Sequence, residues 1–118
     1  MSDPQKVRDR LLARFPAHRY KDLSIGDGWI ELVDDLDTQI AALYPEYEIH
    51  QVKEKFGGLR YYIGAVPSEV YNDVRSLITH AEAKSYGICE ECGAGGEQTS
   101  TRSWIRTLCA RHLAEHQI

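Results

Sequence analysis

The residues best suited to chemistry lie between positions 89 and 112. Cys89 and Cys92 form a C-x2-C pair that is followed by Gly93, and Cys109 and His112 form a C-x2-H pair after sixteen intervening residues. All three cysteines of the chain belong to this pattern. Thiolate and imidazole are the ligands that zinc prefers in a closed tetrahedral site. Their types and spacing therefore predict a structural Zn²⁺ site on these two pairs.

Other chemistry of these side chains fits the sequence less well. A disulfide would leave one of the three cysteines unpaired, and a reducing cytosol disfavours it. A redox-active C-x2-C pair normally accompanies a βαβ pattern, which the sequence lacks. Two alternatives stay open. Cys109 could act as a nucleophile with His112 or His116, and His116 could replace His112 as the fourth ligand because it lies one helical turn further on.

The segment that carries these ligands has the order of elements typical of a treble-clef zinc site. A C-x2-C knuckle leads through the glycine-rich run 93–96 and the strand-like run 104–108 to a short helix expected over 110–117. Four protein ligands leave no position for a reactive water, and treble-clef nucleases need a further histidine and a general base near a second metal. The residues between the ligand pairs offer other side chains, namely Arg102, Trp104 and Arg106. This composition disfavours a metal-dependent hydrolase.

Residues 46–65 are rich in the aromatic and β-branched types that strands favour. We predict a β-hairpin of strands 48–56 and 59–64, joined by Gly57 and Gly58 as a two-residue turn. Its tip could bind phosphates or carboxylates and stack on a ring. The side chains for this contact are Lys53, Lys55 and Arg60, with Tyr61 or Tyr62 as the stacking ring. The alternative is a tight turn with cross-strand pairs and one buried tyrosine.

Apolar side chains at intervals of three and four predict three amphipathic helices. Their expected limits are residues 4–15 with Ser2 or Asp3 as N-cap, residues 29–43 with Asp27 as N-cap, and residues 68–86 with Ser68 as N-cap. A loop is expected over 18–28. We assign Trp29 to the core, since it begins an apolar stripe, whereas Trp104 is the better candidate for a contact with a partner.

Charge is unevenly distributed along the chain. Residues 1–21 carry six basic and two acidic groups, whereas residues 22–54 carry one basic and nine acidic groups. The acidic side chains of the second helix are Glu31, Asp34, Asp35 and Asp37. The two segments could meet different partners, or they could attract each other within one fold. Glu31 and Asp35 stand one turn apart, but spacing places no third ligand for a hard cation, so a solvated face is favoured.

Length and composition limit the possible functions. A chain of 118 residues with 42% hydrophobic residues can bury a core. We expect an α+β domain over 1–87, with helices packed on a short antiparallel β-hairpin, and a treble-clef-like zinc module over 88–118. The net charge of −4 argues against general binding to polyanions. Because no apolar run reaches the ~18 residues of a membrane-spanning helix and no secretory signal is recognised, we expect a cytoplasmic protein.

Three motifs give the chain a resemblance to known proteins. They are Gly26-Asp27-Gly28-Trp29, QVKEKFGGLRYY at 51–62, and the tail that contains CEECG and WIRTLCARH. Together they cover roughly residues 25–113 and resemble a family of small proteins from phages and bacterial mobile elements. The resemblance implies a phage or prophage context and a zinc-binding tail. It implies no activity, so no catalytic residue is carried over.

These observations predict a non-enzymatic zinc-binding protein that binds and modulates a host protein complex, acting in the host cytoplasm. Such a small acidic protein could inhibit a host defence, as anti-CRISPR proteins do, with its acidic segment mimicking a nucleic-acid backbone. The predicted partner-binding residues are Glu31, Asp34, Asp35, Lys53, Lys55, Arg60, Tyr62, Arg102, Trp104 and Arg106. The main alternative is a nucleic-acid-binding zinc module that uses the basic residues of the hairpin together with Arg102, Trp104, Arg106 and Arg111. A metal-dependent hydrolase would need a second metal site, which the sequence does not place.

Overall fold

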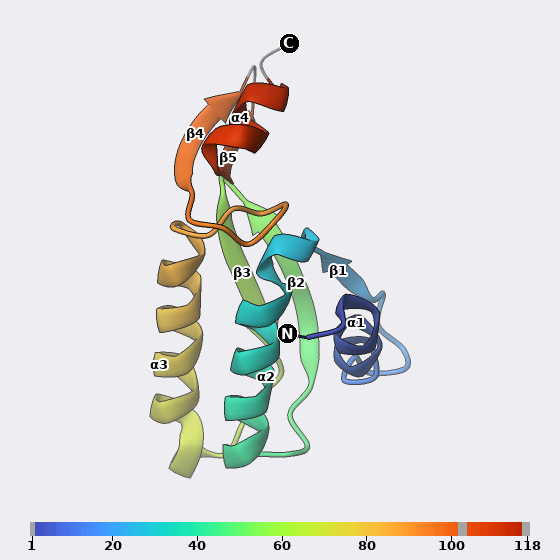
Figure 1. Ribbon diagram of the computed structural model, residues 1–118. Helices are drawn as coiled ribbons and strands as arrows, with labels where there is room; N and C mark the ends of the chain where they lie inside the picture. Colours follow the sequence, from blue (N-terminus) through green and yellow to red (C-terminus); the bar gives the residue numbers. More distant parts are fainter. Residues whose placement is uncertain (1, 102–103, 117–118) are drawn as a thin grey trace.

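The computed structural model describes residues 2–101 and 104–116 (Figure 1). Its elements are α1 (Pro4–Leu12), β1 (Asp22–Ser24), the 3₁₀ turn η1 (Asp27–Trp29), α2 (Ile30–Leu43), β2 (Ile49–Lys55), β3 (Gly58–Ile63), α3 (Ser68–Ser85), β4 (Glu97–Thr101), β5 (Trp104–Leu108) and α4 (Ala110–His116). One sheet has the strand order β1-β2-β3, and β4 pairs with β5 in the other. The predicted α+β class is confirmed. Within the described ranges, no helix is long and apolar enough to cross a membrane.

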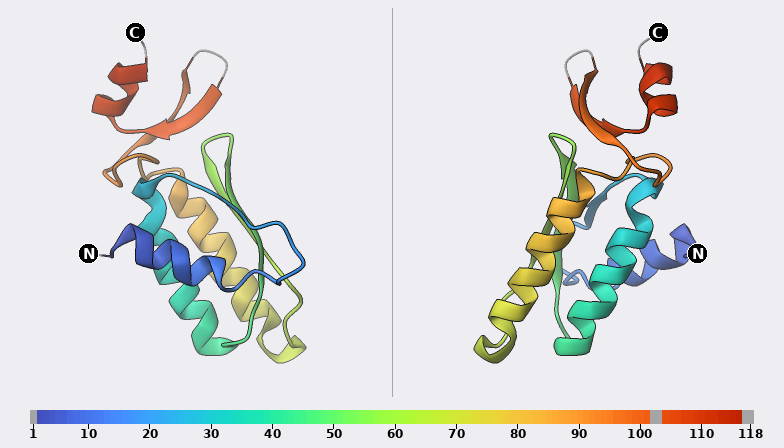
Figure 2. Two further views of the ribbon diagram at one scale, coloured as in Figure 1. Left: turned by 90° about the vertical axis from the view of Figure 1, so that its right-hand side faces the viewer. Right: turned by 60° about the vertical axis from the view of Figure 1, so that its left-hand side comes forward.

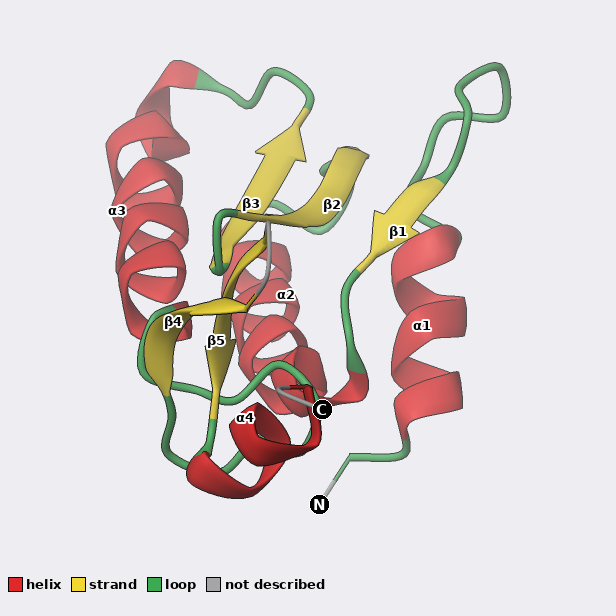
Figure 3. Cartoon of the chain, turned by 90° about the horizontal axis from the view of Figure 1, so that it is seen from above, coloured by secondary structure: helices red, strands yellow, loops and turns green. Residues whose placement is uncertain are grey.

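Helices cover one face of the three-stranded sheet. Seen from above, α1, α2 and α3 lie on the same side of β1, β2 and β3 (Figure 3). Val52 and Tyr61 are paired across β2 and β3 and are fully buried in the core between sheet and helices. The next pair along the strands, Lys53 and Arg60, points to the opposite face, since successive side chains alternate. The sheet therefore has one apolar and one polar face.

The predicted hairpin is confirmed, but the sheet contains a strand that was not expected. β1 lies within the predicted loop 18–28 and pairs in parallel with β2, with Leu23 opposite Val52. It has three residues, of which Leu23 is the middle one. A segment this short shows no period of two, so its sequence carries no strand pattern. Its pairing with β2 is a tertiary contact.

The turn of the hairpin differs from the prediction by one residue. Lys55 pairs with Gly58, so Phe56 and Gly57 form the turn and Gly58 begins β3. Both turn residues have a positive φ, 56° at Phe56 and 82° at Gly57, as a type I′ hairpin requires. Gly58 is needed in the strand for another reason: a Cβ there would overlap the ring of Tyr86. Gly57 thus allows a positive φ in the turn, and Gly58 leaves room for the Tyr86 ring. Phe56, the other turn residue, has a positive φ that is strained for a residue with a Cβ.

We expect Phe56→Asn to stabilise the protein by about 0.5–1 kcal/mol. A non-glycine residue in the left-handed region costs roughly 1–2 kcal/mol, and asparagine tolerates it best. Little packing is lost, because Phe56 is 58% exposed. Urea unfolding would measure the gain, with Phe56→Leu as the control that keeps the strain. If the asparagine variant were no more stable than the leucine variant, relief of backbone strain would be the wrong explanation.

Two of the predicted helix caps are wrong. Asp3 caps α1 as predicted, accepting from the backbone N–H of Gln5 at 3.0 Å. Asp27, however, does not cap α2, because its carboxylate accepts from the Arg8 guanidinium at 2.8 Å and η1 precedes the helix. Ser68 lies inside α3 and donates to the Glu69 carboxylate instead of capping the helix. Asp27 is engaged by a residue distant in sequence, and Ser68 by its direct neighbour, so neither side chain caps its helix.

A buried carboxylate joins α1, α2 and the sheet. Asp37 is 1% exposed and accepts from the guanidinium groups of Arg10, at 2.9 Å, and Arg14, at 2.5 Å. It also accepts from the hydroxyl of Tyr47, which lies 2.7 Å from the hydroxyl of Tyr61. The basic first segment and the acidic second segment of the chain therefore attract each other within the fold.

The two buried hydroxyls predict a loss of stability in alkali. Burial, followed by the neighbouring Tyr61 and Asp37, raises the pKa of Tyr47, and burial likewise raises the pKa of Tyr61. Above pH ~10 the unfolded chain releases these two protons while the folded chain keeps them. The free energy of unfolding should therefore fall with rising pH, by about 1.4 kcal/mol per pH unit for each tyrosine.

Urea unfolding between pH 9 and 11 would measure this slope. Tyr61→Phe should reduce this slope by the contribution of one tyrosine, about 1.4 kcal/mol per pH unit. Tyr71→Phe, at a half-exposed position, should leave the slope unchanged. Absorbance at 295 nm offers a second readout. Reversible ionisation of all seven tyrosines in the folded protein would contradict the assignment.

Candidate metal centre

The four predicted metal ligands meet at one point. Cys89 and Cys92 lie in the loop between α3 and β4, Cys109 follows β5 directly, and His112 lies in the first turn of α4. Their sulfur and ring nitrogen atoms all lie within 4.8 Å of one another. The knuckle turns back at Gly93, which has a φ of 82° and donates its backbone N–H to the Cys89 carbonyl at 3.0 Å. This group of side chains could hold a metal ion.

The distances fit a tetrahedral thiolate and imidazole site. Metal–sulfur bonds of about 2.3 Å in a tetrahedron place two sulfur atoms about 3.8 Å apart. The Cys92 and Cys109 Sγ atoms are 3.8 Å apart. The Nδ1 atom of His112 lies 3.5 Å from Cys89 Sγ and 3.2 Å from Cys109 Sγ. Nδ1 is therefore the ring atom that would bind the metal.

Backbone hydrogen bonds lower the pKa of two of the three thiols. Burial alone would raise the pKa of Cys89, but hydrogen bonds from the backbone of Cys109, Cys92 and Glu91 outweigh it and lower the pKa to about 6. The pKa of the Cys109 thiol is also lowered, chiefly by a backbone hydrogen bond from His112. Despite one backbone hydrogen bond, the pKa of Cys92 is raised by desolvation and by the other two thiols, which lie beside it. Thiolates are the form that binds metal, so Cys89 and Cys109 are the two ligands that favour a divalent ion.

The structure distinguishes the two histidines that the sequence left open. His112 is buried, and its Nε2 atom lies 3.6 Å from the Glu115 carboxylate, a contact that orients metal-binding imidazoles. His116 points elsewhere: its Nε2 atom contacts the Glu91 carboxylate and lies 3.4 Å from the Arg106 guanidinium. The hydrogen bond from His116 lowers the pKa of Glu91. The fourth member of the cluster is therefore His112.

The metal-binding segment is fixed to the rest of the protein at two places, which Figures 1 and 2 show as the joint below β4 and β5. At the first, the backbone N–H of Gly28 donates to the Glu90 carbonyl at 2.9 Å, and the indole of Trp29 donates to the Ile88 carbonyl at 2.9 Å. At the second, the Thr107 hydroxyl donates to the Gly57 carbonyl at 2.6 Å. The knuckle thus contacts η1, and β5 contacts the hairpin turn.

We expect Gly28→Ala to loosen the first contact. A Cβ at this position would overlap the Cys89 carbonyl oxygen and the Glu90 backbone, and overpacking of this kind costs about 1–3 kcal/mol. The matched control is Gly95→Ala in the same segment, because a Cβ there meets nothing within 4 Å. Thermal unfolding with bound zinc would compare the two variants. Equal melting temperatures would show that the knuckle does not pack on η1 in solution.

The predicted partner-binding residues do not form one surface. Glu31 and Asp35 are exposed on α2, whereas the neighbouring Asp34 accepts from Arg10 and from the Ser2 hydroxyl. The hairpin residues Lys53, Lys55, Arg60 and Tyr62 share the polar face of the sheet. Trp104 and Arg106 lie on β5, and Arg102 lies outside the described residues. The predicted residues of α2 lie in the helical layer, whereas those of the hairpin lie on the open face of the sheet.

Glu90 is the site residue that the sequence did not single out. It stands between two ligands, where an exposed knuckle residue would be expected, yet it is 4% exposed. Its backbone N–H donates to the Thr107 carbonyl at 3.0 Å, and its carboxylate accepts from the Thr107 backbone N–H at 2.7 Å. Glu90 thus links the knuckle to β5, and it also lines a cavity beside the metal centre. The C-x2-C spacing predicts neither of these roles.

In comparisons with family models, curated proteins and solved structures, none matches this chain.

Proposed function

We propose that the protein is a non-enzymatic zinc-binding protein in which one structural Zn²⁺ holds a treble-clef-like module, and that it acts by binding a partner protein. The observation that carries the first part is the closed set of three thiols and one imidazole at tetrahedral spacing. When bound, zinc would link the knuckle, the end of β5 and α4. Four protein ligands leave the ion no open position for substrate.

Metal analysis of the purified full chain tests this assignment. We expect one zinc ion per chain, and replacement by Co²⁺ should give the intense visible absorption of a tetrahedral, thiolate-rich site. The spectrum also reports geometry, so it separates a structural site from an open one. Two zinc ions per chain, or a weakly absorbing octahedral cobalt spectrum, would contradict the proposal.

The partner part of the proposal is supported by exposed apolar side chains near the joint. Phe56, Trp104 and Ile105 are among the large hydrophobic side chains left exposed, and aromatic residues are enriched where proteins bind one another. The net charge of −4 favours a protein over a polyanion. The resemblance to phage proteins makes a host protein complex, including a defence complex, the first class of partner to test.

Capture on the tagged full chain from bacterial lysate, with and without nuclease, tests this class. We expect one protein to be retained in near-stoichiometric amount after nuclease treatment and to be lost with Trp104→Ser, an exposed position where the fold should not change. The purified partner should then bind the wild type directly. Retention that disappears with nuclease would contradict a protein partner.

A second candidate function, nucleic-acid binding, is favoured by one observation. Lys53, Arg60 and Tyr62 share the open sheet face, while the acidic α2 lies in the layer on the opposite side (Figure 3). Cations beside an exposed ring suit a single strand, with bases stacked on the tyrosine. Fluorescence anisotropy with labelled single-stranded 20-mers should then show affinity that falls steeply with salt. The slope of log affinity against log salt concentration should be smaller by about one in Lys53→Gln. Lys84→Gln, in α3, should have no such effect.

A further inference from the structure

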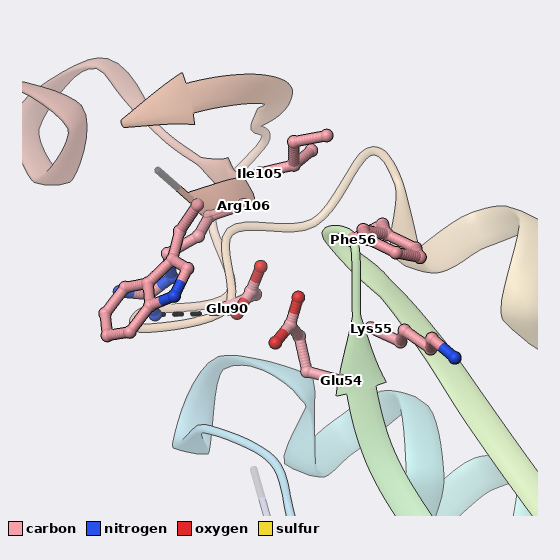
Figure 4. Close-up of a pocket in the computed structure, with 7 residues that line it drawn as sticks. Glu54, Lys55, Phe56, Glu90, Ile105 and Arg106 are labelled. Carbon is pink, nitrogen blue, oxygen red and sulfur yellow. Dashed lines mark hydrogen bonds and ion pairs between the residues drawn. The ribbon is translucent and has the colours of Figure 1, made fainter. Parts of the chain in front are cut away.

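Beside the metal centre, a cavity lies between the two parts of the fold. It has a volume of about 460 Å³ and lies between the β2–β3 turn, the knuckle and β5 (Figure 4). Its lining consists of Glu54, Lys55, Phe56, Glu90, Trp104, Ile105 and Arg106. The metal centre does not use these side chains.

Two carboxylates form the floor of this cavity. Figure 4 shows the side chains of Glu54 and Glu90 directed toward each other from β2 and the knuckle. Glu54 accepts from the backbone N–H of Gly57 at 2.7 Å. The cavity therefore places two carboxylates side by side, and a cation between them would be stabilised.

The basic side chains of the lining do not occupy the space between the Glu54 and Glu90 carboxylates. The Arg106 guanidinium lies 3.5 Å from the Glu90 carboxylate, but it also contacts Glu91, at 3.7 Å. The ammonium of Lys55 lies 5.6 Å from the centre of the Phe56 ring, and Figure 4 shows it directed away from Glu54. One arginine is thus shared between two carboxylates at the edge, and Glu54 faces the open cavity.

The rim of the cavity is apolar and exposed. Trp104 is 71% exposed, Phe56 58% and Ile105 41%. Phe56 is also held at a backbone angle that disfavours any residue with a Cβ. Aromatic rings near carboxylates suit a cationic head on an apolar stem, because the rings contact the stem and attract the cation with their faces.

We propose that this cavity binds a lysine or arginine side chain of the partner protein, with the cationic head between Glu54 and Glu90 and the adjoining apolar residues against Phe56, Trp104 and Ile105. This inference rests on the proposed partner-binding function and names the chemistry of the partner. The two walls come from the hairpin turn and from the metal-binding segment. Binding therefore requires the joint between them to stay closed.

The test uses purified, zinc-loaded full chain and two tripeptides. The probe is acetyl-Leu-Arg-Leu-amide, and its neutral isostere carries citrulline in place of arginine. Titration followed by ¹H–¹⁵N NMR should shift the Trp104 indole and the amides of Gly57 and Thr107 in a saturable way. We expect the citrulline peptide to bind at least ~10-fold more weakly, as the loss of one charge-assisted contact implies.

Variants separate this site from general attraction to an acidic protein. Glu54→Gln keeps the acceptor for the Gly57 N–H and should weaken the arginine peptide ~3- to 10-fold. Glu97→Gln removes the same charge from an exposed position on β4 that does not line the cavity, and should change affinity less than twofold. Equal binding of both peptides, or equal effects of both variants, would overturn the inference. A partner captured from lysate that binds Glu54→Gln as well as wild type would overturn it too, while leaving the proposed function standing.

Discussion

Replacement of Cys89 or Cys109 by serine should remove zinc from the protein and unfold the segment that follows α3. Apparent zinc-binding free energies of small metal modules are about 10–16 kcal/mol. A segment of ~30 residues cannot replace that stabilisation with a core of its own. Zinc content should fall from one ion per chain to a small fraction, and hydrogen exchange should lose protection in β4, β5 and α4. Amides of α2 and β2 should stay protected.

The two histidines supply the matched control for this result. His112→Ala should behave like the cysteine variants, whereas His116→Ala should keep full zinc, because His116 contacts Glu91 and Arg106 and not the thiols. Zinc analysis after dialysis against a mild chelator would compare them. If His116→Ala lost zinc and His112→Ala retained it, the ligand set would be wrong. If neither lost zinc, the metal would be bound elsewhere.

Asp37→Ala should destabilise the protein by about 3–5 kcal/mol, the usual effect of removing one partner of a buried ion pair. Asp37 is the common acceptor for Arg10, Arg14 and the Tyr47 hydroxyl. Its removal leaves two cations and a buried hydroxyl without their shared acceptor. Arg14 lies 4.5 Å from the centre of the Tyr47 ring, so the loss should also disturb the packing of α1 on the sheet.

Asp35→Ala is the control for this prediction. It lies two residues earlier on the same helix, removes the same charge and is exposed, so its effect should stay within about 0.5 kcal/mol. Urea unfolding monitored by far-UV circular dichroism would measure both variants. A loss below about 1 kcal/mol in Asp37→Ala would mean that water replaces the carboxylate. The Asp37 cluster would then not be what holds α1 and α2 to the sheet.

The features that the sequence predicted well are those that local spacing determines. Apolar residues three and four apart located α1, α2 and α3. The two ligand pairs located the metal cluster, although the sequence left His116 open as an alternative to His112. β1 was not predicted, because Leu23 becomes part of a strand only by pairing with β2. The hairpin turn was misplaced by one residue because the ring that excludes a side chain at Gly58 belongs to Tyr86, far along the chain.

The acidic face of α2 shows a second limit of reading spacing alone. Asp34, Asp35 and Asp37 look equivalent in the sequence, yet Asp37 is buried, Asp34 is paired and Asp35 is exposed. Their difference depends on where α1 crosses α2. The cavity beside the metal centre was missed for the same reason. Glu54 and Glu90 are distant in sequence and meet because the metal-binding segment packs on η1 and on the hairpin turn.

The two contacts at the joint also determine how this architecture can be exchanged between proteins. The carbonyls of Ile88 and Glu90 receive their hydrogen bonds from η1, and the Thr107 hydroxyl finds its acceptor at Gly57. A chimera that carried residues 88–116 alone onto a foreign domain would leave these backbone groups unsatisfied against a surface that was not shaped for them. The metal-binding segment is therefore not transferable on its own. Recombination could transfer it intact only together with η1 and the β2–β3 turn, as one block from Gly26 onward.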